Sequence, residues 1–169
     1  MKRIYATVLL AFAFASPVFA ADTPFYGGLS IGPSSIASSS STAIGIFAGY
    51  RLNNVKMGGM GTLALEAQYT SLGSDLYGDN FASVGVDAVA FFPIKTAQNL
   101  SIFGTLGLNS ISGNFSCGNL CSYTSSSGLV LDAGFGGQYR LSSEFSVRAG
   151  YEYYDNNFSA LYAAGIYNF

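Results

Sequence analysis

The side chains most able to do chemistry in this sequence are three arginines and four carboxylates. They lie within segments in which apolar and polar residues alternate. Paired carboxylates can act as general acid and base in hydrolysis, and a carboxylate beside an arginine forms an ion pair. Every carboxylate of the set has arginines available as partners. We therefore interpret the set as a polar network of ion pairs rather than as a catalytic or conducting site. Its members are Arg51, Glu66, Asp87, Asp132, Arg140, Arg148 and Glu152.

The sequence contains no histidine, which removes the commonest general base, proton shuttle and metal ligand. One G-x-S-x-G match occurs at residues 28–32, with Ser30 at its centre. It falls on a predicted strand and lacks the strand–turn–helix context of a nucleophile elbow. We therefore expect no enzymatic activity, no cofactor and no metal site.

Cys117 and Cys121 are separated by three residues within a Ser- and Gly-rich stretch. A small disulfide that closes a loop tip suits a protein exported to an oxidising compartment. The alternative is a redox or metal site, but two thiols without histidine or a second cysteine pair make a poor one. The sequence favours a structural loop disulfide.

The composition disfavours a freely soluble globular protein. Of its 169 residues, 50% are apolar, 15% are aromatic and 9% are charged, whereas soluble domains carry about 25% charged residues. The net charge is −2 without a basic cluster, so the electrostatic footprint of a nucleic-acid-binding protein is missing. Length allows one domain.

The beginning of the sequence has the pattern of a cleaved signal peptide. Two basic residues precede an apolar run at 6–15, Pro17 interrupts any helix, and Ala20 follows as a small residue at the cleavage position. The apolar run is short for a membrane anchor, and no later stretch is long enough for a transmembrane helix. We expect residues 1–20 to be a signal peptide and residues 21–169 to be the exported domain.

Apolar and polar residues alternate with a period of two along the exported domain, which predicts β-strands. All seven charged residues of the polar network fall on the face opposite the aliphatic one. A charged side chain is tolerated in the lumen of a membrane barrel but not on its lipid face. A soluble barrel would reverse the two faces. The eight predicted strands are 25–32, 42–52, 62–71, 83–92, 100–109, 129–141, 145–154 and 158–169.

Two further features favour the membrane barrel. Short turns at 93–99 and 142–144 alternate with longer polar loops at 33–41, 73–81 and 110–128, as in outer-membrane barrels. The low-complexity run 34–42 is expected to be a flexible, solvated loop. Aromatic residues also gather at predicted strand ends near one rim, as an aromatic girdle: Phe25, Tyr50, Phe92, Tyr139, Phe145, Tyr167 and Phe169.

The segments IFAGYRL, GLVLDAGFGGQYRL, FSVRAGYEYY and the terminal GIYNF resemble the OmpA/OmpX-type outer-membrane β-barrel family. This resemblance covers residues 25–169 and implies an eight-stranded antiparallel up-and-down transmembrane β-barrel of a Gram-negative outer membrane. Tyr167 and Phe169 match the terminal signal by which the barrel-assembly machinery recognises that family. Full-length OmpA carries a further periplasmic domain, and we expect the barrel alone here. Outer-membrane enzymes of similar architecture rely on a catalytic histidine, which this sequence lacks.

We therefore predict an all-β, monomeric outer-membrane protein, embedded in lipid, with a side-chain-filled lumen. Its expected role is structural or surface-interacting, in the manner of an adhesin, through external loops. Two alternatives stay open. One is a narrow channel of low conductance, and the other is a soluble, lipocalin-like barrel that binds an apolar ligand.

Overall fold

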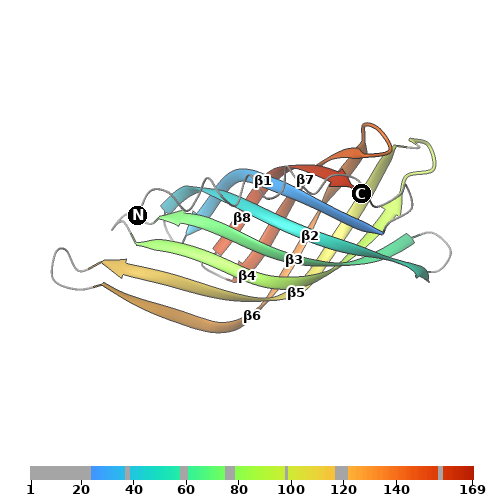
Figure 1. Cartoon of the computed structure of the whole chain (residues 1–169). Helices are drawn as coiled ribbons and strands as arrows, with labels where there is room; N and C mark the ends of the chain where they lie inside the picture. The colour runs from blue at the N-terminus through green and yellow to red at the C-terminus, as the bar shows by residue number, and fades with distance from the viewer. Residues whose placement is uncertain are drawn as a thin grey trace.

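The computed structural model describes residues 24–36, 39–57, 61–74, 79–97, 99–116, 122–155 and 158–169. Each strand pairs antiparallel with its sequence neighbours, and β1 pairs with β8 to close the barrel (Figure 1). The predicted eight-stranded antiparallel barrel is confirmed. Its strands are β1 (Phe25–Ile36), β2 (Ser39–Met57), β3 (Gly61–Ser74), β4 (Asn80–Pro93), β5 (Leu100–Ser116), β6 (Ser122–Arg140), β7 (Phe145–Asp155) and β8 (Phe158–Asn168).

The aliphatic face of the strands lies on the outside of the barrel. Leu106 and Leu131 are 62% and 69% exposed, while Asp132, the next residue on the same strand, is buried. This is the arrangement that lipid requires, because the bilayer solvates apolar side chains and penalises charged ones. The soluble alternative needs the opposite orientation of the faces and is wrong for this chain. Among the described residues, no helix has the length and apolarity to cross a membrane.

The strands extend further than predicted at one end of the barrel. The stretch 33–41, expected to be a long polar loop, continues the pairing of β1 with β2 as far as Ile36↔Ser39. Ser34 is buried there and donates a hydrogen bond to the carbonyl oxygen of Leu72. The loop prediction was wrong because serine carries little periodicity signal, whereas a neighbouring strand satisfies the backbone of any residue.

The β5–β6 hairpin shows the same extension. Its strands pair as far as Ser116↔Ser122, and it projects past the neighbouring strands in Figure 1. The predicted loop 110–128 is therefore mostly strand. Gly128 has a φ of 84° and lies where the β5–β6 register shifts, so its backbone forms the kind of bulge that glycine permits. We call this end of the barrel the loop rim.

The opposite end, which we call the turn rim, matches the prediction more closely. β4 ends at Pro93 and β5 begins at Leu100, while Leu141 to Glu144 connect β6 to β7. The Leu141 amide donates a hydrogen bond to the carbonyl oxygen of Phe145 and closes that turn. Because the connections at the turn rim are short, the strands differ in length mainly at the loop rim.

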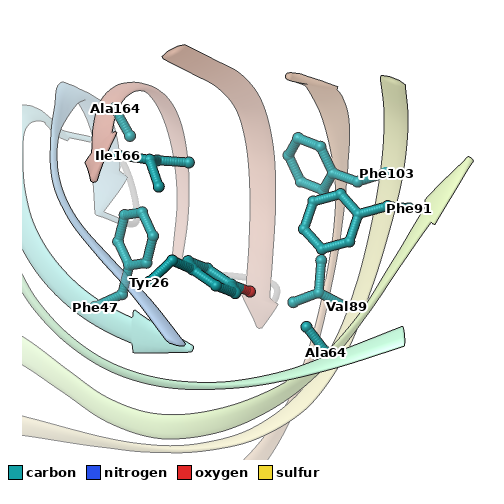
Figure 2. Packing of buried hydrophobic residues seen from close by; sticks show 8 residues of the cluster. All are labelled: Tyr26, Phe47, Ala64, Val89, Phe91, Phe103, Ala164 and Ile166. Carbon is teal, nitrogen blue, oxygen red and sulfur yellow. The ribbon is translucent and has the colours of Figure 1, made fainter. Parts of the chain in front are cut away.

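Two apolar clusters fill much of the interior. The turn-side cluster places the rings of Tyr26 and Phe47 across from those of Phe91 and Phe103 (Figure 2). Its other members are Ala64, Val89, Ala164 and Ile166. The loop-side cluster consists of Ile36, Ala43, Leu72, Ile111, Tyr154 and Ala160. The polar residues predicted to face the lumen lie between and beside these clusters.

Candidate functional site in the barrel interior

Arg148 on β7 and Glu66 on β3 form a buried ion pair. Arg148 Nη2 lies 2.8 Å from Glu66 Oε1, and Nη1 donates a hydrogen bond of 3.0 Å to Glu66 Oε2. The pair is therefore bidentate, the geometry that gives an arginine–carboxylate contact its strength and direction. Only 3% of Arg148 is exposed, so the two charges depend on each other.

Aromatic rings of the turn-side cluster surround this ion pair. The Arg148 guanidinium carbon lies 4.9 Å from the ring centroid of Phe103, 5.1 Å from Phe47 and 5.4 Å from Phe91. Ring faces attract a cation at such distances, more so where water is excluded. Tyr26 adds a hydrogen bond from its hydroxyl to Glu66 Oε1. The arginine is thus compensated by a carboxylate and by π-electrons together.

The other two predicted arginines lie at the turn rim. Arg51 stacks 4.5 Å from the Tyr26 ring centroid and donates a hydrogen bond of 2.7 Å to Asn168 Oδ1. Arg140 is exposed and lines, together with Arg51, a cavity of about 340 Å³ at this rim. Neither arginine forms an ion pair with a carboxylate of the described chain.

Asp87 on β4, Asp132 on β6 and Glu152 on β7 form a second cluster, which we call the carboxylate cluster. Each residue offers a carboxylate oxygen, and these oxygens all lie within 4.8 Å of one another. Gln68 Nε2 donates hydrogen bonds to Asp87 Oδ2 at 2.6 Å and to Glu152 Oε1 at 3.0 Å. The cluster therefore takes its carboxylates from three strands, and β3 supplies the amide that bridges two of them.

Further donors converge on the carboxylate cluster. The Tyr154 hydroxyl donates to Glu152 Oε2 at 2.9 Å, and Asn109 Nδ2 approaches Asp87 Oδ1 at 3.4 Å. Ser83 fixes that amide by donating to Asn109 Oδ1 at 2.7 Å. All of these donors are neutral, so they orient the carboxylates without cancelling their charge.

A cavity of about 20 Å³ lies beside the carboxylate cluster. Its lining includes Gln68, Asp87, Thr105 and Glu152, together with Arg148 from the ion pair. This volume suffices for one water molecule or one ion. The lumen therefore holds a small polar chamber where the ion pair meets the carboxylate cluster.

The other predicted positions fall at the rims or outside the described residues. Tyr167 lies on the outer surface at the turn rim, 5.1 Å from Phe145 and 5.2 Å from Phe169 between ring centroids. Phe25 and Tyr50 form a similar pair at 4.9 Å. Cys117 and Cys121, and the predicted signal peptide at 1–20, lie outside the described residues.

The uncharged polar residues of the lumen were not predicted from the sequence. Tyr26, Gln68, Asn109 and Tyr154 contact the charged groups but were not singled out. Gln68 and Asn109 already stood on the polar face of predicted strands, which was a usable signal. Tyr26 and Tyr154 gave none, because a tyrosine suits a lumen or a membrane interface equally.

A profile of the family described as "Outer membrane protein beta-barrel domain" matches residues 6–167. The chain belongs to this outer-membrane β-barrel family. Membership implies an outer-membrane location and agrees with the outward aliphatic face. No curated protein matches the sequence.

Solved structures similar to this outer-membrane barrel include a surface protein, an attachment invasion locus protein and an enzyme. Neisserial surface protein A, NspA, is 18% identical with a TM-score of 0.65, covering 87% of this chain and 98% of that chain. Ail, the attachment invasion locus protein of Yersinia pestis, is 19% identical with a TM-score of 0.61, covering 85% and 94%. The outer membrane enzyme PagL is 13% identical with a TM-score of 0.56, covering 85% and 99%. These likenesses show a shared fold.

Proposed function

We propose that the protein is a structural outer-membrane barrel without catalytic activity that acts in surface contacts through the hairpins of its loop rim. The observation that carries this proposal is the projection of the β5–β6 hairpin. Leu108 and Leu129 are the last exposed aliphatic residues on its two strands. Beyond them the strands continue through 110–116 and 122–128, a reach of about 20 Å at the usual rise of a strand.

The loop-rim stretches have a composition that restricts the partner. Residues 32–43, 71–83 and 110–128 are rich in serine and contain no lysine or arginine, while Asp75 and Asp79 add negative charge. A related Ail structure is described as a complex with the heparin analogue sucrose octasulfate. Strongly anionic ligands need basic groups, so the sequence favours a neutral or basic partner surface here, bound through hydroxyl and backbone groups.

The filled interior supports a role for the outer surface rather than for transport. The turn-side cluster fills part of the interior, and the Arg148–Glu66 ion pair lines the small polar chamber. An eight-stranded barrel has an interior just wide enough for side chains. We expect no single-channel conductance when the purified protein is added to planar bilayers.

We propose that the barrel is a monomer in lipid and that the barrel-assembly machinery inserts it. A closed barrel has no free strand edge, which supports a monomer in lipid. Tyr167 and Phe169 support insertion by the barrel-assembly machinery. Substitution of both by alanine is expected to reduce the outer-membrane content of folded protein without preventing its refolding in detergent.

Surface attachment of cells that display the barrel tests the proposal. Cells with the full protein are expected to adhere to epithelial monolayers more than cells with a variant whose residues 112–126 are replaced by a two-residue turn. Serine-to-alanine changes at Ser142 and Ser143, in a turn-rim loop, provide the matched control. Equal adhesion of the shortened and full-length barrels, both folded by their heat-dependent gel mobility, would contradict the proposal.

A further inference from the structure

The charges of the lumen do not balance at the carboxylate cluster. Arg148 is committed to Glu66 by the bidentate ion pair. Among the described residues, no lysine or arginine lies within ion-pairing distance of Asp87, Asp132 or Glu152. All three carboxylates are nonetheless buried, and burial of an uncompensated charge is strongly unfavourable.

Asp132 is the member of the cluster whose buried charge is compensated least by neighbouring groups. Only 2% of the residue is exposed, and neither of its carboxylate oxygens has a hydrogen-bond partner within the described structure. Asp87 and Glu152 each accept two hydrogen bonds from neutral donors. A buried carboxylate without a donor at hydrogen-bonding distance is rare in native proteins and calls for an explanation such as a bound water molecule or ion.

The backbone at Gly107 lets two of the carboxylates approach each other. Gly107 on β5 pairs with Asp87 on one side and with Asp132 on the other. A Cβ atom at Gly107 would lie 1.9 Å from Asp87 Oδ1 and 2.5 Å from Asp132 Oδ1. The two oxygens therefore converge over the glycine, from neighbouring strands on both sides, and any larger residue would push them apart.

The ligand set indicates the kind of group. The carboxylate oxygens of the cluster all lie within 4.8 Å of one another, close enough to share one ion. Ca²⁺ accepts irregular sets of oxygen ligands, whereas Mg²⁺ demands near-ideal octahedral geometry and usually keeps several waters. Three buried carboxylates from three strands therefore favour Ca²⁺.

We propose that Asp87, Asp132 and Glu152 bind one hard divalent cation of the Ca²⁺ type inside the barrel. Thr105 supplies a neutral oxygen nearby, since its buried hydroxyl has no hydrogen-bond partner and lines the same small cavity as Asp87 and Glu152. Water molecules in that cavity complete the coordination. The cation ties β4, β6 and β7 together across the lumen.

The rival explanation is a proton held by Asp132 and shared with its neighbours, which would neutralise part of the cluster without a metal. The two explanations differ in what they respond to. A cation site responds to chelator and to the identity of the ion, whereas a shared proton responds to pH alone. Spectroscopy and unfolding measurements on the mature barrel separate them.

Terbium luminescence is the first measurement. Tb³⁺ takes Ca²⁺ sites, and Tyr154, hydrogen-bonded to Glu152, is positioned to sensitise it in a protein without tryptophan. The mature barrel, refolded in detergent micelles with chelator and then freed of it, is titrated with Tb³⁺. We expect saturable emission at one ion per barrel, which Ca²⁺ displaces more readily than Mg²⁺.

The matched variants are Asp132→Asn, which keeps the shape of the side chain, and Glu144→Gln, which removes an exposed carboxylate at the turn rim. Asp132→Asn is expected to lower Tb³⁺ affinity at least tenfold, and Glu144→Gln to leave it unchanged. Should Asp132→Asn fail to refold, Asp87→Asn serves as the second variant. Loss of affinity in Glu144→Gln as well would assign the ion to the surface and overturn the proposal.

Urea unfolding gives an independent readout. At a Ca²⁺ concentration 100 times its dissociation constant, the ratio of folded to unfolded barrel is expected to rise about 100-fold, and to be unchanged by Ca²⁺ in Asp132→Asn. A wild-type stability that ignores Ca²⁺ and chelator but increases as the pH falls would overturn the cation site in favour of the shared proton.

Discussion

The barrel interior contains two levels of buried charge that are compensated in different ways. At the level of Glu66, one carboxylate faces one arginine, and aromatic rings enclose the pair. At the carboxylate cluster, three acidic groups meet neutral donors and no protein cation within the described residues. At the first level, the charges are compensated by side chains of the protein itself. At the second level, the compensating charge comes from the proposed cation.

Strand β7 connects the two levels. Arg148 and Glu152 lie on the same inward face, four residues apart, which is too far along a strand for direct contact between their charges. Each residue instead meets β3, Arg148 through Glu66 and Glu152 through Gln68. The comparison shows that alternation along one strand places charges in the lumen, whereas the neighbouring strands decide whether they are paired.

Arg148→Met is expected to have the largest effect. It leaves Glu66 buried without a cation, and breaking a buried ion pair in this way costs about 3–5 kcal/mol. Urea unfolding in micelles, followed by heat-dependent gel mobility, measures the loss. The double variant Arg148→Met with Glu66→Gln is expected to recover more than half of it, and a double variant as unstable as the single one would show that the aromatic packing, not the charge, stabilises this level.

Neutralising one carboxylate at each level is expected to have opposite effects. Glu66→Gln removes the partner of Arg148 and should destabilise the barrel by about 3 kcal/mol. Asp132→Asn, measured in chelator, should stabilise it by about 1 kcal/mol, because the new amide donates to its neighbours and one uncompensated charge disappears. Equal signs in urea unfolding would contradict the contrast between the two levels.

Gly107→Ala tests the space at the carboxylate cluster. The added methyl group would collide with Asp87 and Asp132, and such overpacking costs about 1–3 kcal/mol. Gly165→Ala on β8 is the matched control, because a Cβ atom there meets no other atom within 4 Å. We expect the control to unfold at the wild-type urea concentration, and equal stability of both variants would show that the cluster has room to spare.

Tyr26→Phe is expected to have the smallest effect of the series. It deletes the hydroxyl donor to Glu66 but leaves both hydrogen bonds from Arg148, so the loss should be about 1 kcal/mol. The same unfolding assay measures it. A loss as large as that of Arg148→Met would assign the stability of this level to the tyrosine.

The pattern of the sequence predicted the barrel and the face of its charges because lipid imposes a strict rule on alternate residues. Glu66, Asp87, Asp132, Arg148 and Glu152 are all buried, on the predicted face. The extent of the loop-rim strands could not be predicted, because serine-rich segments such as 34–42 carry no apolar alternation. Arg140 stood on the polar face as well, but it ends its strand and lies exposed at the turn rim.

The sequence by itself determined the strands and the separation of apolar from polar faces, because both depend on a local period of two and on the solvent that each face meets. Only the tertiary structure decided that Arg148 takes Glu66 while Asp87, Asp132 and Glu152 gather around Gly107. Those contacts depend on the register between strands far apart in sequence and on the closure of the barrel, which brings β3 and β7 within reach across the lumen. The alternation of residues along one strand carries no information about which strands face each other across the lumen.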